Sequence, residues 1–412
     1  MSNPRTAFST LAGGLLTVLL AQGIGRFGYT PLLPLMQQAE GFGPGIGGYI
    51  ASVNYWGYLF GALLATRVAT SPNRLAWFRA AIVVVILTTA AMGLADSYIA
   101  WGAIRFLSGL SGGLAIVLGA TLTQEGVRQY QIANWAGIYF SGVGFGIALT
   151  GTIVWLLTGA LGWQQQWLLL AGISLLFAIP AWRWVHSSTP SQQSGANAAD
   201  NGREWTLPVW LLVAAYFLDG FGYVASTTFL VSIITSLPNL EDWGNQTWVL
   251  VGIAAAPSCI LWALLIPRFG YFKPLIAIYV LQAAAIVLPI VVDGVVGAVI
   301  GGVLFGATFL SAISLSFNLA SHLVTTNTGR LLGVMTTLFG AGQIVGPAIS
   351  GWLMDRTGSF DLALIMSASA IGLAAILLAI AHMLHHKNQT AINPPQLRPR
   401  PAGADNSETT VR

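Results

Sequence analysis

Three ionisable side chains stand inside long apolar stretches of this sequence: Arg26, Arg105 and Asp219. A charge at the middle of a membrane helix costs about 2.5 to 3.5 kcal/mol on insertion scales, so such residues usually face a polar pathway. A guanidinium there can bind a carboxylate or phosphate, and a carboxyl group there can carry a proton. Asp219 is the one acid deep within an apolar stretch, which makes it the leading candidate for proton coupling.

Arg26 and Asp219 occupy nearly equivalent places in the two halves of the chain. Aligning the segment Phe27-Gly-Tyr with the segment Phe221-Gly-Tyr places Arg26 one residue from the position that matches Asp219. Opposite charges therefore lie at similar depths in two different apolar stretches. Two interpretations stay open, a buried structural ion pair and a role in cargo or proton handling.

Polar side chains recur at helical spacing around these charges. Residues three, four and seven positions apart share one face of a helix, so each set forms a polar stripe. For any single stripe, hydrogen bonding between helices explains the pattern as well as contact with cargo does. The expected lining of a cargo pathway is Arg26, Tyr29, Asn54, Tyr55, Tyr58, Tyr223, Ser226 and Asn318.

The composition places most of the chain in lipid. Charged residues make up 7% and hydrophobic residues 55%, whereas a soluble domain carries about 25% charged residues. The net charge of +4 is spread along the chain, which argues against a nucleic-acid partner. The single cysteine, Cys259, excludes an intramolecular disulfide, and the pair His385-His386 lacks the further ligands of a metal site. We therefore expect no metal and no cofactor.

Windows of about 19 residues predict twelve transmembrane helices, each long enough to cross a hydrocarbon core of about 30 Å. The expected fold is an all-α membrane protein with two pseudosymmetric six-helix bundles, residues 1–186 and 207–384. A polar cytoplasmic linker is expected at 187–206 and a disordered cytoplasmic tail at 385–412. The expected spans are 10–36, 46–67, 77–95, 98–123, 134–158, 166–186, 207–236, 246–266, 274–292, 295–323, 331–354 and 360–384.

A repeat joins the two halves. Ten residues beginning at Gly142, GVGFGIALTG, recur 200 positions later as GQIVGPAISG, beginning at Gly342. Gly146 follows Gly142 by four residues, and Gly346 follows Gly342 by four. Small residues at this spacing let helix backbones approach closely. Helix packing suffices to explain these glycines, while Pro347, which lacks a backbone donor, would in addition permit bending during transport.

The basic residues predict the orientation. Of the 17 lysines and arginines, all but Arg26 and Arg105 lie in loops, in tails or close to the ends of spans. Fourteen of these fifteen fall on one side of the twelve-span arrangement, and only Arg356 falls on the other. The positive-inside rule then puts both termini and the linker in the cytoplasm. The acidic loop residues stand on the opposite side: Glu40, Asp96, Glu241, Asp242, Asp293, Asp355 and Asp361.

These motifs resemble the major facilitator superfamily of transporters. The segment GQIVGPAISGWLMDRTG is similar to the superfamily's Gly-Pro helix that ends in G-x-L-x-D-R-x-G, and it includes Asp355 as the motif's acid. Arg105-Phe-Leu-Ser-Gly resembles the R-x-x-Q-G motif, with Ser108 in place of Gln. The resemblance implies a role for Arg105 in proton coupling, although capping by neighbouring carbonyls and Ser108 fits the sequence equally well. In the loop after the second span, Ala65 stands where the superfamily has Asp.

The opening GIGRFGYTPLLPLM, from Gly23 to Met36, is similar to the YbfB/YjiJ-type branch of that superfamily. The resemblance implies a monomeric secondary active transporter that moves a small solute across the bacterial inner membrane by alternating access, with proton coupling. A uniporter, or a drug or metabolite exporter that does not use Asp219, is the alternative. A membrane enzyme would need a nucleophile with a base or a metal cluster, and a non-transporting sensor would need a soluble signalling domain. Arg26 favours an anionic group on the cargo.

Overall fold

The computed structural model describes residues 4–130, 135–186, 205–324 and 328–392, and every regular element in these ranges is a helix. The first group comprises α1 (Pro4–Val18), the π-helix η1 (Leu19–Ile24), α2 (Tyr29–Glu40), α3 (Pro44–Val68), α4 (Arg74–Met92), α5 (Tyr98–Val127), the 3-10 turn η2 (Arg128–Tyr130), α6 (Trp135–Leu157) and α7 (Trp163–Trp184). The second comprises α8 (Leu207–Thr235), α9 (Trp243–Ala263), α10 (Ile266–Phe269), α11 (Phe272–Val291), α12 (Val295–Leu323), α13 (Thr328–Thr357) and α14 (Asp361–Ile392).

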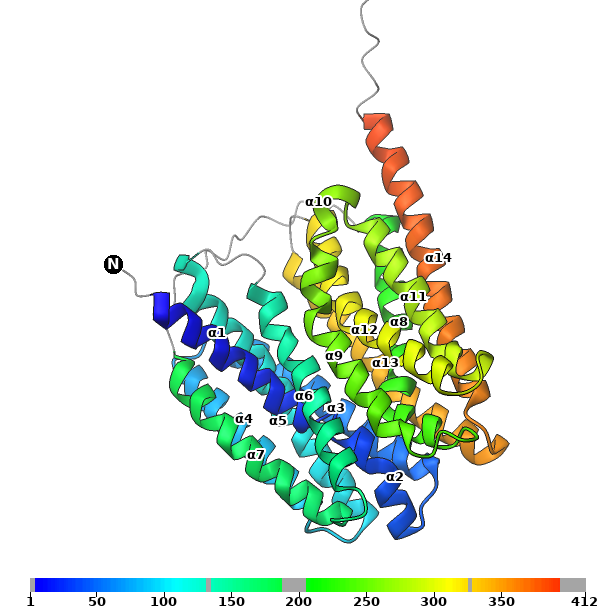
Figure 1. Ribbon diagram of the computed structural model, residues 1–412. Coiled ribbons are helices and arrows are strands. Elements are labelled where there is room, and N and C mark those ends of the chain that lie inside the picture. Colours follow the sequence, from blue (N-terminus) through cyan, green and yellow to red (C-terminus); the bar gives the residue numbers. More distant parts are fainter. Residues whose placement is uncertain (1–3, 131–134, 187–204, 325–327, 393–412) are drawn as a thin grey trace, which may run out of the picture.

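The helices gather into two groups, α1 to α7 and α8 to α14, that stand side by side (Figure 1). The groups meet along two pairs of long helices, because α3 packs on α13 and α6 packs on α9. In the view of Figure 1 the groups are close at the lower end, where α2 reaches across to pack on α8, and they diverge toward the upper end.

Eleven of these helices are long and apolar enough to cross a membrane. They correspond to eleven of the twelve expected spans. The remaining one, expected at 46–67, is present as the 25-residue helix α3 but is not among the eleven. Five glycines together with Asn54 and three tyrosines reduce the hydropathy of α3. The small residues allow α3 to pack closely against α5 and α13. Twelve spans and a two-fold pseudosymmetry therefore stay predictions.

The first span is not one continuous α-helix. It runs from Ala7 to Glu40, but η1 widens it to a π-helix and four residues, 25–28, form turns before α2 begins. In this break the amides of Gly25 and Phe27 donate to carbonyls five residues earlier, Leu20 and Gln22, at 2.9 Å each. Such local widening redirects carbonyls and side chains, and it commonly occurs at functional sites. Arg26 lies within this break.

The expected tail begins too early. Helix α14 continues to Ile392, so the expectation of disorder is wrong for residues 385–392. That stretch holds no glycine or proline, and Pro394 is the first residue that would stop a helix. The rest of the tail and residues 187–204 of the expected linker lie outside the described residues.

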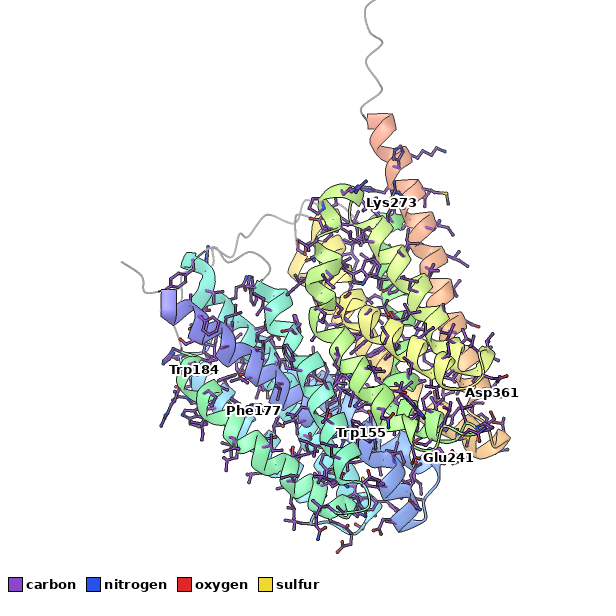
Figure 2. All side chains as sticks on the ribbon, viewed as in Figure 1. Trp155, Phe177, Trp184, Glu241, Lys273 and Asp361 are labelled. Atoms are coloured by element: carbon purple, nitrogen blue, oxygen red, sulfur yellow. The ribbon has the colours of Figure 1, made fainter. Side chains whose placement is uncertain are left out.

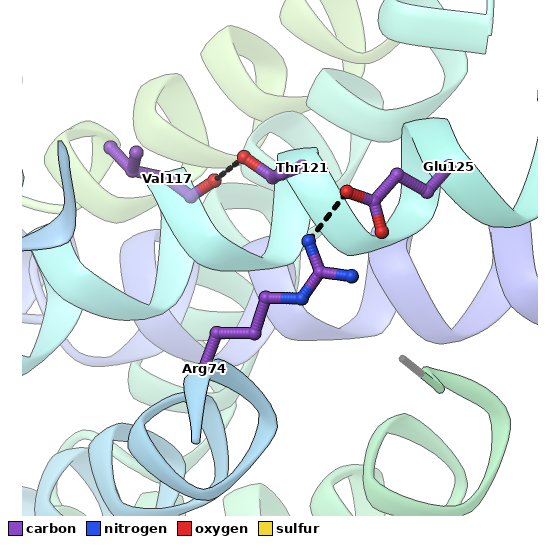
Figure 3. Close-up of polar contacts among 4 residues, drawn as sticks. All are labelled: Arg74, Val117, Thr121 and Glu125. Carbon is purple, nitrogen blue, oxygen red and sulfur yellow. Dashed lines mark hydrogen bonds and ion pairs between the residues drawn. The ribbon is translucent and has the colours of Figure 1, made fainter. Parts of the chain in front are cut away.

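Charges separate between the two ends of the molecule. Lys273 lies at the upper end of the view in Figure 2, whereas Glu241 and Asp361 lie at the lower end. At the basic end, Arg74 at the start of α4 forms an ion pair of 2.6 Å with Glu125 near the end of α5 (Figure 3). The side chains of Arg74 and Glu125 are 6% and 25% exposed, so this ion pair between α4 and α5 is partly buried.

The two copies of the repeat make matching contacts within their own groups. In α6, the backbone at Gly142 lies against Leu15 of α1, and that at Gly146 lies against Gly23 of η1. In α13, Gly342 and Gly346 both lie against the backbone of Phe221 in α8. A side-chain carbon at any of these four glycines would meet backbone atoms closer than packed atoms approach.

The same repeat also makes matching contacts between the groups. Gly151 of α6 faces Val249 of α9, and Gly351 of α13 faces Pro44 of α3. The duplicated segment thus supplies both an internal seam and a seam between the groups, once in each half of the chain.

Candidate functional site

Arg26 reaches from the break in the first span to the other group of helices. Its Nη2 donates a hydrogen bond of 3.0 Å to the hydroxyl of Tyr223 in α8, and its Nη1 donates a long one of 3.4 Å to Oε1 of Gln22. The guanidinium carbon lies 4.3 Å from the ring centre of Tyr55 and 5.0 Å from that of Tyr58. Arg26 is 8% exposed, and within the described residues its Nε has no hydrogen-bond partner.

Tyr223 is held on three sides by the second group. Its ring stacks between Phe309 of α12 and Phe339 of α13, with ring centres 6.2 Å and 5.6 Å away and planes within 14° of parallel. Its hydroxyl accepts a short hydrogen bond from Nε2 of Gln343 in α13. Because the ring is fixed in this way, the hydroxyl that meets Arg26 has a defined position.

Arg105 of α5 holds the break in place. Its Nη1 donates to the carbonyl of Gly25 at 2.6 Å and its Nη2 donates to the carbonyl of Arg26 at 3.0 Å. Ser108 also donates to the Gly25 carbonyl at 3.2 Å, and Asn54 of α3 donates to the Arg105 carbonyl at 2.7 Å. The geometry favours the second of the two interpretations of Arg105, a guanidinium that caps backbone carbonyls freed by the irregular helix.

Asp219 lies apart from Arg26. The two residues form no ion pair with each other in the described part of the chain, because Arg26 turns to Tyr223 while Asp219 turns to α11. Nε2 of Gln282 in α11 donates to Oδ1 of Asp219 at 3.1 Å, and Asp219 is 1% exposed. The nearly equivalent positions of Arg26 and Asp219 in the two halves thus do not make them partners.

The other expected pathway residues divide between this cluster and its surroundings. Tyr29 donates to the carbonyl of Gly47 at 3.1 Å, and its ring lies 4.9 Å from the Arg105 guanidinium, so it supports the break. Ser226 is buried in α8, one turn beyond Tyr223. Asn318 is exposed on α12, nine residues or roughly 14 Å along the helix from Phe309. It lies toward the basic end and not at Arg26.

Four residues of the site were not singled out from the sequence: Gln343, Gln282, Phe309 and Phe339. The glutamines carried a usable signal, since a long amide inside an apolar span needs a partner as much as a charge does. The phenylalanines carried none, because their type is common in any apolar span.

A small cavity lies beside Arg26, between the two groups of helices. Its volume is about 10 Å³, roughly enough for one water molecule. Cargo can therefore occupy this place only after side chains around it move. The lining residues are Arg26, Phe27, Tyr29, Thr30, Ala51, Asn54, Tyr55, Arg105, Thr227 and Thr228.

Contacts between the groups also seal the acidic end. Thr30 of α2 donates a short hydrogen bond to the carbonyl of Thr227 in α8. Asp355 of α13 accepts a hydrogen bond of 3.0 Å from the amide of Gly45, in the first turn of α3. The path from Arg26 toward this end is thus crossed by paired polar groups and by the seam of Gly48 with Pro347.

One family model matches most of the chain. The sequence model of the family described as "Uncharacterised MFS-type transporter YbfB" matches residues 18–379. The chain belongs to this family of the major facilitator superfamily. The expected superfamily and branch are confirmed.

Relatives of this family member are transporters of several kinds. It is 23% identical over 378 residues to the "Uncharacterized MFS-type transporter YceJ" of Bacillus subtilis, which covers 90% of this chain and 94% of the relative. It is 21% identical over 324 residues to the "Probable sulfoacetate transporter SauU" of Cupriavidus necator, at 70% and 74% coverage. The crystal structure of a mutant of the nucleoside transporter NupG matches with a TM-score of 0.71 and 15% identity, over 91% of this chain and 99% of that one, which shows the shared fold.

Proposed function

We propose that this family member is a secondary transporter of a small organic anion, and that Arg26 binds the anionic end of the cargo. The observation that carries the proposal is the state of Arg26: a buried guanidinium at the seam of the two groups with no carboxylate partner in the described residues. The side chains that contact it are neutral hydroxyl, amide and aromatic groups, and Arg105, which lines the same cavity, is a second cation, so among the described residues no group neutralises the charge of Arg26.

A buried cation of this kind is costly to keep without a function. An ion removed from water loses several kcal/mol of hydration, and neutral partners return only part of it. A carboxylate or sulfonate could form two parallel hydrogen bonds with the guanidinium and would also neutralise its charge. The unpartnered Nε and the easily released Nη1 bond to Gln22 offer the donors for such a pair.

The Tyr223 hydroxyl stands where an anionic oxygen would bind. It lies 3.0 Å from Nη2 of Arg26, a normal distance for a charge-assisted hydrogen bond, and the adjoining cavity has room for about one water molecule. We infer that cargo displaces this hydroxyl when the two groups separate. Sulfoacetate, the solute in the name of one relative, the "Probable sulfoacetate transporter SauU", has a sulfonate and a carboxylate, and either group fits the same guanidinium.

Alternating access is the proposed mode of movement. The seal at the acidic end and the divergence of the helices at the basic end fit a conformation that opens toward the basic end. In this proposal α3 is the twelfth span, both termini are cytoplasmic and the membrane is the bacterial inner membrane. A reporter enzyme active only in the periplasm, fused after residue 195, should stay inactive, and an active fusion would reverse the orientation.

Proton coupling through Asp219 completes the proposal. Asp219 is buried in α8 four residues before Tyr223, so the two lie one helical turn apart on the same face. In this proposal, a change in the protonation of Asp219 alters the position of Tyr223, the partner of Arg26, through one turn of α8. The variant Asp219→Asn should bind cargo but lose accumulation driven by a pH gradient. Normal accumulation in that variant would favour the alternative, a uniporter or an exporter with a different coupling site.

Thermal-shift measurements on the purified protein test the anion site directly. Short mono- and dicarboxylates, sulfonates and uncharged nucleosides would be screened, because a ligand at 100 times its dissociation constant adds about 2.7 kcal/mol of stability. We expect stabilisation by a carboxylate or sulfonate in the wild type, little in Arg26→Ala, and a reduced effect in Arg26→Lys, whose ammonium cannot form the fork.

Arg79→Ala is the matched control. Arg79 also stacks its guanidinium on an aromatic ring, that of Trp182 at 4.9 Å, but it lies away from the seam of the two groups. This variant should keep the full anion effect. Equal stabilisation of Arg26→Ala and the wild type by the same anion would remove Arg26 from the cargo site.

A further inference from the structure

Two buried acceptor oxygens, on side chains that contact each other, lack donors among the described residues. Oδ2 of Asp219 and Oε1 of Gln282 have no hydrogen-bond partner among the described residues, although the same two side chains are joined through Gln282 Nε2 and Asp219 Oδ1 at 3.1 Å. Asp219 is 1% exposed and Gln282 is fully buried. A buried acceptor without a donor costs about 1 to 3 kcal/mol, and more when it is charged.

One proton satisfies both oxygens. We propose that Asp219 is protonated in this conformation and forms a reciprocal pair with Gln282, in which Oδ2–H donates to Oε1 while Nε2 donates to Oδ1. A carboxylic acid and an amide have matching donor and acceptor edges, so the pair closes through two hydrogen bonds. The proposal rests on the proposed function only for its consequence in transport, since the pair itself exists in the protein without cargo.

In the described part of the chain, no cation contacts Asp219 to balance an ionised carboxylate. The titratable groups that act on it are hydroxyls, those of Tyr216 and Tyr223 on α8 and of Tyr279 on α11. Tyr279 is engaged with Ser316 of α12 at 3.2 Å. The other charged or titratable side chains in the described parts of the helices packed against α8 make no hydrogen bond or ion pair with Asp219. They are Tyr29 and Glu40 on α2; Cys259, near Ser258 and Ser311, on α9; Lys273 on α11; His322 on α12; Arg330, Asp355 and Arg356 on α13; and Asp361, His382, His385, His386 and Lys387 on α14.

Gln282 thereby becomes a positioning residue for the coupling proton. When the proton leaves to water on one side of the membrane, Oδ2 and Oε1 face each other as two acceptors and repel, so the pair must open or the amide must rotate. An opening of the pair would separate α8 from α11 at a point one turn from Tyr223. A proton at Asp219 would in this way be linked to the Tyr223 contact with Arg26 across the seam.

Infrared spectroscopy of the purified wild-type protein tests the pair without any cargo. A protonated carboxyl group has its own C=O stretching band, which an ionised carboxylate lacks. We expect this band at neutral pH in the wild type and its loss in Asp219→Asn, whose amide can keep both hydrogen bonds with Gln282. In Gln282→Met the band should remain but move to higher frequency. The carbonyl of the acid then no longer accepts a hydrogen bond from Nε2, and its O–H no longer has Oε1 as an acceptor.

Gln166→Met is the control for Gln282→Met. Gln166 on α7 is likewise fully buried, and within the described residues its Oε1 also lacks a partner, but it belongs to the other group of helices. Its replacement should leave the band unchanged. The exchanged pair, Asp219→Asn with Gln282→Glu, should restore a carboxyl band, because one acid again faces one amide.

Three results would contradict the proposed pair of Asp219 and Gln282. The first is the absence of a carboxyl band that depends on Asp219, and the second is a band that does not move in Gln282→Met. The third is a band that sodium chloride removes and potassium chloride does not, because the two oxygens would then bind a sodium ion. Each leaves the anion site intact if carboxylates or sulfonates still stabilise the wild type over Arg26→Ala. Conversely, a failed anion screen leaves the infrared result valid.

Discussion

The carboxylate of Asp355 caps a helix of the opposite half of the molecule: its Oδ2 accepts the amide of Gly45 at 3.0 Å, across 310 residues of sequence. Gly45 lies in the first turn of α3, after Gly43 and Pro44, and none of α3's own side chains caps that end. A helix N-terminus carries unpaired amides and a partial positive charge, both of which favour a carboxylate. The motif that ends α13 therefore closes the seam at the acidic end.

Asp355→Ala should open that end more often. Losing an N-terminal cap costs about 1 kcal/mol, so the population of molecules open at the acidic end should rise roughly fivefold. Distances between spin labels at Gln38→Cys in α2 and Glu241→Cys before α9, in a background with Cys259→Ser, would report the change. The distribution should gain a longer component.

Asp361→Ala provides the comparison for this experiment. Asp361 is an acid at the same end, in the first turn of α14, but α14 does not form the seam with α3. Its replacement should leave the distances unchanged. Identical distributions for Asp355→Ala and the wild type would show that the cap does not hold the two halves together.

Tyr223→Phe should strengthen anion binding if the hydroxyl stands in for the cargo. In this variant Nη2 of Arg26 no longer donates to the Tyr223 hydroxyl and is free for the anion. Loss of this competing hydrogen bond to a charged group is worth about 1.5 kcal/mol, or roughly a tenfold gain in affinity for the anion. Titration calorimetry with an anion found in the thermal-shift screen gives the dissociation constants.

Tyr139→Phe is the matched control, because the Tyr139 hydroxyl is also buried and donates to the Ile116 carbonyl at 2.8 Å, away from Arg26. It should lower thermal stability and leave anion affinity unchanged. Weaker binding in Tyr223→Phe would mean that the hydroxyl contacts the bound anion and does not stand in its place.

The sequence indicated burial better than it indicated partners. Arg26 and Asp219 were expected inside apolar spans, and both are buried. Their partners depend on the direction in which each side chain leaves its helix, which a linear pattern does not contain. Arg26 turns across the seam to Tyr223, and Asp219 turns toward Gln282 of its own group.

Helix packing was more accessible from sequence than helix irregularity. The spacing of Gly142 and Gly146 already indicates a close helix contact, since a glycine pair leaves a groove whatever its neighbour is. The break at 25–28 depends on a partner 80 residues away, Arg105, whose two Nη groups bind carbonyls that a regular helix would keep for itself. The expectation that α3 spans the membrane stays a prediction, because α3 is not among the eleven helices that are long and apolar enough to cross.

Arg105→Ala should lower stability more than it alters coupling. It would leave the Arg26 carbonyl with only the long bond of 3.5 Å from the Tyr29 amide and the Gly25 carbonyl with Ser108 alone. A fully unsatisfied buried group costs about 1 to 3 kcal/mol, so two weakened carbonyls lower stability by a part of that amount each. Thermal unfolding in detergent should show a lower midpoint, with partial recovery in Arg105→Lys. A normal midpoint together with uptake that no longer depends on the pH gradient would instead support the proton role that the superfamily resemblance implies.

Gly146→Ala and Gly346→Ala should both destabilise the protein, and the leucine variants should impair folding or transport more severely. A side-chain carbon at Gly146 would come within 2.9 Å of the Leu19 carbonyl oxygen, and one at Gly346 within 2.8 Å of the Phe221 carbonyl oxygen. Backbone atoms cannot rotate away, so overpacking of about 1 to 3 kcal/mol is expected at each site. Thermal unfolding and yield from membranes measure the effect.

Gly172 on α7 and Gly372 on α14 are the matched glycines for this series, since a side-chain carbon at either would meet nothing within 4 Å. Alanine at these two positions should be neutral or stabilising by up to about 1 kcal/mol, because alanine favours the helix over glycine. Packing at the repeat and helix propensity therefore act in opposite directions on the same Gly→Ala change. Equal midpoints for all four variants would mean that the α6 and α13 seams relax around an added methyl group and do not depend on the repeated glycines.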